Sequence, residues 1–147
     1  MRVALDTNIL AYAEGVNGAA RKANALELIQ RLPAGSALLP VQTLGELFQL
    51  LVRKVNRTPA QARSAILGWR DAFPLIETSE TVIVGAAELA ATHRFSFWDG
   101  VVLASAAEGG CRLLLSEAVM RAKLNQRVFR ASSTPCMRHT MTSKLDA

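Results

Sequence analysis

The alternation of apolar and polar residues divides the first 117 residues into short apolar runs and longer segments of helical periodicity. The apolar runs cover residues 2–5, 36–41, 75–77 and 111–115. Runs this short and this apolar are typical of strands that are buried on both faces of a sheet. They predict four strands, spread along the chain from its start to residue 115.

Segments with helical spacing separate these strands. In residues 42–55, leucine and phenylalanine recur at positions 44, 47, 48 and 51, which lie on one face of a helix. Thr58, Pro59 and Gln61 have the pattern of an N-cap, a first-turn proline and a capping-box glutamine. The predicted helices cover residues 19–32, 42–55, 58–73, 82–93 and 96–107.

Short strands that alternate with helices predict a parallel sheet covered by helices on both faces. Ligands of such sheets bind beyond the carboxyl ends of the strands. Asp6 directly follows the first predicted strand, and Ser116 and Glu117 follow the last. These polar residues are therefore candidates for a functional site.

Composition indicates one ordinary globular domain with a real core, because 50% of the 147 residues are hydrophobic and 20% are charged. No apolar run reaches the roughly 20 residues that a membrane span needs. No signal peptide is expected, because the first apolar run meets Asp6 almost at once. Cys111 and Cys136 form neither a disulfide framework nor a zinc-site spacing. We expect a cytoplasmic protein with reduced thiols.

The net charge of +5 lies at the C-terminal end of the chain. Residues 1–117 hold 11 Lys and Arg against 11 Asp and Glu, whereas residues 118–147 hold six basic residues against Asp146. Periodicity also ends after Glu117, so we expect a folded core in residues 1–117 and a basic tail in residues 118–147. The tail is either a solvated, poorly ordered segment or an arm that attracts phosphate backbones. Its candidate RNA-binding residues are Arg121, Lys123 and Arg127.

Three acids stand out in the core, and each has an ordinary structural interpretation. Asp6 has the residue type of a helix N-cap. Glu46 lies opposite the apolar stripe of its predicted helix, where a solvent-facing residue is the usual finding. Asp99 stands in the first turn of an uncharged helix, where Ser96 and Asp99 resemble a capping box. The alternative interpretation of Asp99 is that it binds a cation.

Taken together, the three acids favour a cation site. Carboxylates that lie close together repel one another, and one takes up a proton unless a cation neutralises them. Oxygen ligands with water suit Mg²⁺ or Mn²⁺, and such an ion polarises a phosphodiester and activates water. No His or Cys accompanies these acids, so zinc is not expected.

Three segments then resemble a known family: VALDTNILAYA, TLGELFQLLVRK and FSFWDGVVLASAAEGGCRLLLSE. They are similar to the PIN domain, and most closely to the VapC-type toxins of bacterial toxin–antitoxin pairs. The resemblance runs from Met1 to about Glu117. It implies a three-layer α/β/α sandwich around a short parallel sheet, here followed by an atypical basic tail.

The resemblance also implies a function and a site. Members of the family are metal-dependent ribonucleases, in which metal-activated water attacks the phosphorus and leaves a 5′-phosphate and a 3′-hydroxyl. By resemblance, Asp6, Glu46 and Asp99 are the acidic ligands of Mg²⁺ or Mn²⁺. Thr7 and Asn8 support the first acid, and Ser116 matches the family's Ser or Thr at the end of the fourth strand.

The chain departs from the family pattern at Ala118. Family members usually carry a fourth acid, an Asp, at this position, and they finish with a further strand. Glu117 is the remaining candidate for a fourth acid. We therefore expect a C-terminal end that has diverged.

Two functions of different classes follow. The first is a Mg²⁺- or Mn²⁺-dependent endoribonuclease, the toxin of a toxin–antitoxin pair, dimeric and neutralised by a cognate antitoxin. The second is a catalytically impaired PIN-fold module that binds RNA or protein. A phosphoacceptor receiver domain needs an acid pair near the first strand and a Lys after a late strand, and both are missing. Trp69 and Trp98 are expected to be packing residues rather than platforms for RNA bases.

Overall fold

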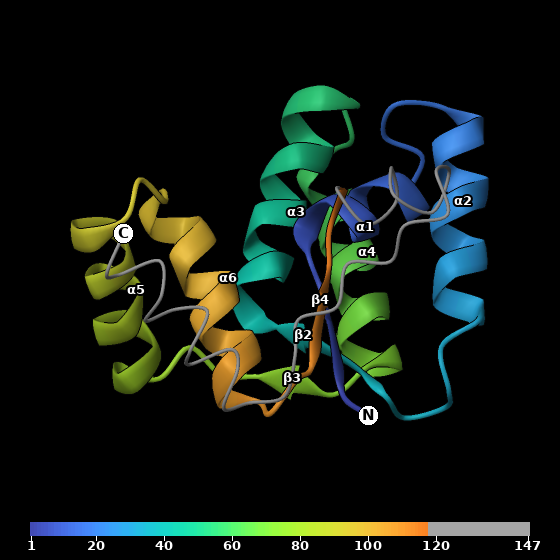
Figure 1. The fold of residues 1–147 in the computed structure, drawn as a ribbon. Helices are drawn as coiled ribbons and strands as arrows, with labels where there is room; N and C mark the ends of the chain where they lie inside the picture. Colours follow the sequence, from blue (N-terminus) through green and yellow to red (C-terminus); the bar gives the residue numbers. More distant parts are fainter. Residues whose placement is uncertain (118–147) are drawn as a thin grey trace.

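A computed structural model describes residues 1–117, which form a helix-rich α/β fold around a parallel sheet (Figure 1). The strands are β1 (Val3–Leu5), β2 (Ala37–Pro40), β3 (Leu75–Ile76) and β4 (Leu113–Leu115). Their order in the sheet is β3-β2-β1-β4, and every pairing is parallel. All four predicted strands are therefore confirmed, each one to two residues shorter than predicted.

The helices are α1 (Thr7–Ala13), α2 (Ala19–Gln30), α3 (Val41–Lys54), α4 (Pro59–Ala72), α5 (Glu80–Thr92) and α6 (Phe97–Glu108). The five predicted helices are present within one or two residues at each end. Periodicity does not predict α1, because six of its seven residues are buried and it has no polar face. None of the described helices is long and apolar enough to cross a membrane.

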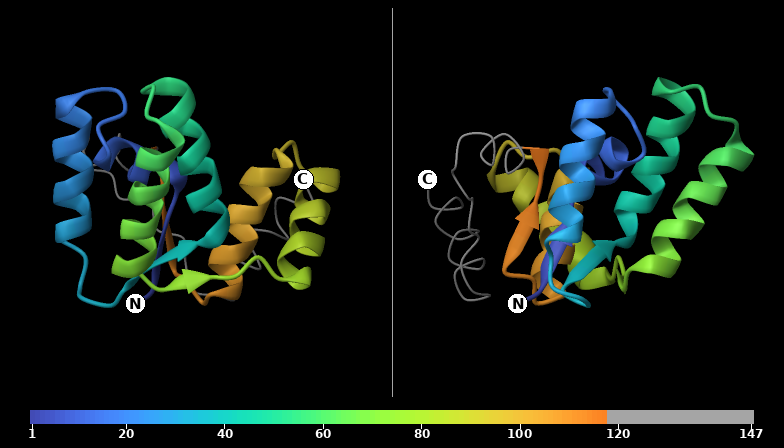
Figure 2. Two further views of the ribbon diagram at one scale, coloured as in Figure 1. Left: turned by 180° about the vertical axis from the view of Figure 1, so that it is seen from behind. Right: turned by 90° about the vertical axis from the view of Figure 1, so that its right-hand side faces the viewer.

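The two faces of the sheet pack against different helices, as successive side chains of β1 show. Val3 and Leu5 lie in a core that also holds buried residues of α1, α2, α3 and α4. Ala4 faces the other side, where it packs with Ala106 of α6 and with Cys111. Figure 2 shows the helices around the sheet from two further sides. The predicted three-layer α/β/α sandwich is confirmed.

The chain winds in two directions from β1, because β2 and β3 lie on one side of it and β4 on the other. Ligand sites of α/β sheets lie at the carboxyl ends of strands at such a switch point. Asp6 follows β1 directly, and its backbone N–H donates to Leu115 O of β4 at 2.9 Å. This hydrogen bond holds the end of β1 against the end of β4.

Helices α3 and α6 lie against β2 and against each other. Helix α3 begins at Val41 without a loop, directly after Pro40 of β2. Helix α6 packs on α5 through Val82, Ala86 and Val101. A side chain at Gly100 would come within 3.2 Å of the Ala86 carbonyl oxygen, so the two helices are close there.

Candidate functional site

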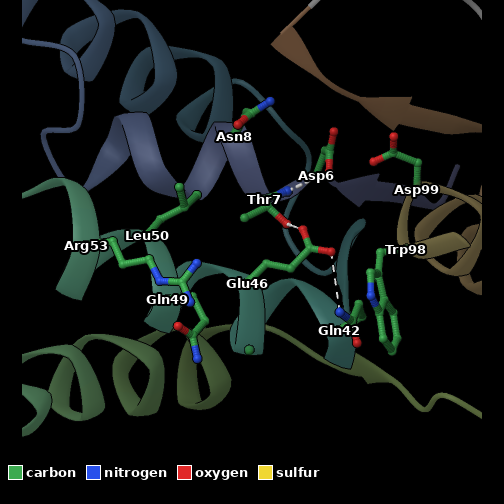
Figure 3. A pocket seen from close by; sticks show the side chains of 11 residues that line it. Asp6, Thr7, Asn8, Gln42, Glu46, Gln49, Leu50, Arg53, Trp98 and Asp99 are labelled. Carbon is green, nitrogen blue, oxygen red and sulfur yellow. Dashed lines mark hydrogen bonds between the residues drawn. The ribbon is translucent and has the colours of Figure 1, made fainter. Parts of the chain in front are cut away.

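A pocket of about 580 Å³ lies where α1, α3 and α6 meet at the end of β1 (Figure 3). It brings together Asp6 from the β1–α1 junction, Glu46 from α3 and Asp99 from α6. Its lining residues are Asp6, Thr7, Asn8, Gln42, Gly45, Glu46, Gln49, Leu50, Arg53, Trp98 and Asp99. The three acids singled out from the sequence thus line one pocket, although 92 residues of chain lie between the first and the last.

Asp6 is both a helix cap and a pocket residue. Its Oδ1 accepts the Thr7 backbone N–H at 2.7 Å, which makes it the N-cap of α1. Figure 3 shows its carboxylate on the side of the pocket that Asp99 also borders. The local interpretation of Asp6 is therefore confirmed, and it is compatible with a place in a site.

Glu46 is held from two sides. Thr7 Oγ1 donates to Glu46 Oε2 at 2.6 Å, and Gln42 Nε2 donates to Glu46 Oε1 at 3.4 Å. Periodicity alone predicts an ordinary solvent-facing residue, and that interpretation is wrong, because α1 lies against this side of α3. The contact between Thr7 of α1 and Glu46 of α3, which the local sequence does not show, places Glu46 in the wall of a pocket.

Asp99 is the most exposed of the three acids. Ser96 is the N-cap of α6, and its Oγ accepts the Asp99 backbone N–H at 3.1 Å. The cap uses the backbone of Asp99, so its carboxylate is available to the pocket, where Figure 3 shows it near Asp6.

Burial, more than the neighbouring acids, raises the proton affinity of Asp6. Burial raises the pKa of Asp6 from 3.8 to about 6, the Thr7 N–H opposes this rise, and the charges of Glu46 and Asp99 add to it. A bound cation would reverse the part of this rise that comes from the charges of Glu46 and Asp99. Those two neighbouring carboxylates therefore make the pocket one that favours positive charge, in addition to the burial that raises the pKa of Asp6.

The donor set fits a hard divalent ion. Its strongest donors are carboxylate oxygens, which Mg²⁺ and Mn²⁺ prefer. Within residues 1–117, no three His, Cys, Asp or Glu side chains already lie as close as the ligands of one ion. Direct contact of one ion with all three acids would need these side chains to move closer, whereas an ion such as Mg²⁺, which keeps several of its waters, can also be held through water.

The other predicted residues lie in different places. Thr7 and Asn8 line the pocket, whereas Ser116, at the end of β4, does not. Glu117 also lies outside the lining, and its Oε1 forms an ion pair with Arg21 Nη1 at 3.2 Å. A ligand role for Glu117 stays a prediction. Arg121, Lys123 and Arg127 of the predicted tail lie outside the described residues, as does Ala118.

The structure adds pocket residues that the sequence interpretation missed. Gln42, Gln49 and Arg53 lie 4 residues before and 3 and 7 residues after Glu46, so the four share one face of α3. This polar stripe is visible in the sequence opposite the apolar stripe. By itself it does not indicate a site, because a polar helix face is normally solvated.

Trp98 corrects a sequence expectation. Trp69 is a packing residue as predicted, stacked on Phe73 and donating its Nε1–H to Glu14 at 2.8 Å. Trp98 is instead 52% exposed and lines the pocket. An almost uncharged helix such as α6 has no polar stripe, so its sequence does not show which side faces solvent.

Comparison with solved structures finds the same fold in proteins of low sequence identity. A Mycobacterium tuberculosis toxin, VapC20, described as cleaving the sarcin–ricin loop, is 20% identical, with a TM-score of 0.68 over 82% of this chain and 94% of that one. A toxin–antitoxin complex from Klebsiella pneumoniae is 19% identical, with a TM-score of 0.60 over 86% and 96%. VapBC2 from Rickettsia felis, bound to a fragment of its promoter DNA, is 17% identical, with a TM-score of 0.57 over 84% and 92%.

A search of curated proteins finds no match. The sequence does match the family model of the PIN domain, over residues 3–119. That match covers most of the chain and includes every residue that lines the pocket. The chain belongs to the PIN domain family.

Proposed function

We propose that this protein is a divalent-metal-dependent endoribonuclease and the toxin of a toxin–antitoxin pair. The observation that carries the proposal is the convergence of Asp6, Glu46 and Asp99 on one pocket, where the pKa of Asp6 is raised to about 6. PIN domains are nucleases, and an acidic pocket needs a cation before it can accept a phosphodiester.

In this proposal Asp6, Glu46 and Asp99 hold Mg²⁺ or Mn²⁺. When bound, the ion polarises the phosphodiester and lowers the pKa of a water molecule. Thr7 donates a hydrogen bond to Glu46 and so fixes its carboxylate. Asp6 is mostly ionised at neutral pH, since its pKa is about 6. Arg53, at the edge of the pocket, is the cation placed to contact a phosphate.

The partners in this proposal are an RNA substrate, a cognate antitoxin and a second copy of the chain, in the cytoplasm. The proposal of an antitoxin rests on the similar structures, which include a toxin–antitoxin complex. The basic tail residues Arg121, Lys123 and Arg127 are proposed to add affinity for RNA.

RNA cleavage by the full chain tests this function. In Mg²⁺ or Mn²⁺ we expect products with a 5′-phosphate, and we expect Asp6→Asn to slow cleavage by about two orders of magnitude or more. Val84→Ala, at a residue that is 57% exposed on α5 and outside the pocket, is the control and should cleave as the parent does. Unchanged cleavage by Asp6→Asn would rule out the assigned site.

The second candidate function is an impaired PIN-fold module that binds RNA or protein. It is favoured by Ala118, which stands where family members carry a fourth acid. If the parent chain is inactive with both ions but binds RNA, this alternative holds. If Ala118→Asp greatly raises the cleavage rate, the natural protein is a weakened nuclease.

A further inference from the structure

Trp98 is an exposed aromatic residue at the wall of an acidic pocket. It directly precedes Asp99 in the first turn of α6, and 52% of its surface is open to solvent. Figure 3 shows its indole on the Gln42 side of the pocket, with Glu46 and Asp99 nearby. Burial in the core does not explain a tryptophan here, so its flat surface is available to a ligand that enters the pocket.

The indole of Trp98 is braced from within the same helix. Its ring lies 4.9 Å from that of Phe97 at an interplanar angle of 71°, an edge-to-face contact. Phe97 is half-buried and packs against the α5–α6 core, so the contact ties the indole to the body of the protein. A braced, exposed indole loses little conformational freedom when a planar group stacks on it.

The polar stripe of α3 extends from Trp98 to the far edge of the pocket. It begins with Gln42 near the indole and ends with Arg53, seven residues or about 10 Å of helix beyond Glu46. No acidic residue of the described chain forms an ion pair with Arg53. The pocket thus has an aromatic surface at one end, a cation at the other and carboxylates between them.

We propose that Trp98 is the stacking platform for an unpaired RNA base next to the phosphate in the acidic pocket, and that Arg53 binds a further phosphate of the same strand. The inference rests on the proposed function and deepens it, since it names single-stranded RNA as the ligand. Base stacking needs a base that has left its duplex, and Arg53 supplies charge where the three acids would otherwise repel the backbone.

Binding without cleavage tests this inference in the full chain carrying Asp6→Asn, with Mg²⁺ present. The probe is a fluorescein-labelled oligouridine of about twelve nucleotides, followed by fluorescence anisotropy. We expect Trp98→Ala to weaken binding about 5- to 100-fold and Trp98→Phe to restore most of the affinity. Val84→Ala, which removes another exposed apolar side chain, should leave the affinity unchanged.

Salt dependence separates the two contacts. Arg53→Gln should reduce the slope of log affinity against log salt by about 0.7, the value of one phosphate contact on a single strand. Trp98→Ala should lower affinity without changing that slope. Arg63→Gln, at an exposed arginine of α4 outside the pocket, is the matched charge control.

Direct contact is measured by fluorescence, because Trp69 and Trp98 are the two tryptophans of the chain. In Trp69→Phe the emission comes from Trp98 alone, and oligouridine should quench it. An unchanged affinity of Trp98→Ala overturns the inference. So does equal affinity for duplex RNA, an unchanged salt slope in Arg53→Gln, or a Trp98→Ala variant that loses only self-association. None of these results depends on cleavage, so they test the stacking contact separately from the proposed function, which the RNA cleavage assay tests.

Discussion

At the residue scale, Asp6 combines two roles that the sequence presents as alternatives. Its Oδ1 caps α1, and its carboxylate also lines the acidic pocket. The residues next to Asp6 in the sequence are compatible with both roles and do not decide between them. A substitution that keeps one role and removes the other separates them in the laboratory.

Asp6→Asn and Asp6→Ala are that pair. Asn is as good an N-cap as Asp, whereas Ala loses the hydrogen bond to Thr7. We expect Asp6→Ala to be about 1 kcal/mol less stable than Asp6→Asn in urea unfolding at neutral pH, while both lose metal-dependent cleavage. Equal stability of the two variants would contradict the capping role.

The raised pKa of Asp6 predicts a particular pH dependence of stability. Because this pKa is about 6 when folded, against 3.8 as the ordinary value, the folded chain takes up the proton more readily than the unfolded chain. The stability from this group is fully present below about pH 4 and is lost as pH rises through about 6, by up to about 3 kcal/mol. In metal-free buffer, Asp6→Asn should therefore gain stability relative to the parent between these pH values. A difference that stays constant with pH would show that the Asp6 carboxyl is not perturbed.

The hydrogen bond from Thr7 to Glu46 should contribute to the metal affinity of the pocket. Thr7 is buried, with 4% of its residue surface exposed, and its hydroxyl donates to Glu46 Oε2 at 2.6 Å. Thr7→Val keeps the shape and removes the donor, so we expect Mn²⁺ affinity to fall about 10-fold. Thr7→Ser, which keeps the hydroxyl, is the control. If both variants bind Mn²⁺ as the parent does, Thr7 does not position Glu46.

At the scale of elements, α1 is held at both ends by contacts that local sequence does not show. Its first residue contacts Glu46 of α3, and Glu14, its C-cap, accepts hydrogen bonds from two other segments. Arg57 Nη1 donates to Glu14 Oε2 at 2.8 Å, Arg57 Nη2 donates to Glu14 O at 2.7 Å, and Trp69 Nε1 donates to Glu14 Oε1 at 2.8 Å. These bonds tie the end of α1 to α4 and to the segment that precedes it.

Arg57→Ala should therefore destabilise the fold without changing the pocket. It removes two charge-assisted hydrogen bonds at a half-buried position, and we expect a loss of about 2 to 3 kcal/mol in the free energy of unfolding. Arg70→Ala breaks an exposed pair with Asp71 and should cost less than about 0.5 kcal/mol. Mn²⁺ affinity should be unchanged in both. A loss of Mn²⁺ affinity in folded Arg57→Ala would mean that α1 transmits this contact to the site.

The elements also show why sequence patterns predicted some features and missed others. Helix α3 has a clear apolar stripe and α4 has clear capping residues, so periodicity predicts the first and the capping pattern predicts the second. Helix α1 is almost wholly buried and α6 almost uncharged, so neither has two distinct faces. For this reason periodicity does not predict α1, and the sequence of α6 predicts a packing residue at Trp98, which is exposed in the structure.

At the scale of the whole molecule, the strand order places the site. Because β1 lies between β2 and β4, the residue after β1 comes beside α3, which follows β2, and beside α6, which precedes β4. The resemblance to PIN domains predicted this convergence of Asp6, Glu46 and Asp99, which no local pattern predicts. The exposed Trp98 and the polar stripe beside these acids became apparent from the tertiary structure.

We propose that Asp6, Glu46 and Asp99, from three separate elements, form a divalent-metal site. Calorimetric titration of Mn²⁺ into the full chain, without RNA, tests it most directly. The parent should show saturable binding of Mn²⁺. The affinity should fall about 10-fold or more in each of the variants Asp6→Asn, Glu46→Gln and Asp99→Asn. The affinity should not change in the control Glu108→Gln, because Glu108 is an exposed acid on α6 outside the pocket. Binding that survives unchanged in all three pocket variants, or a parent that does not bind Mn²⁺, would contradict the account.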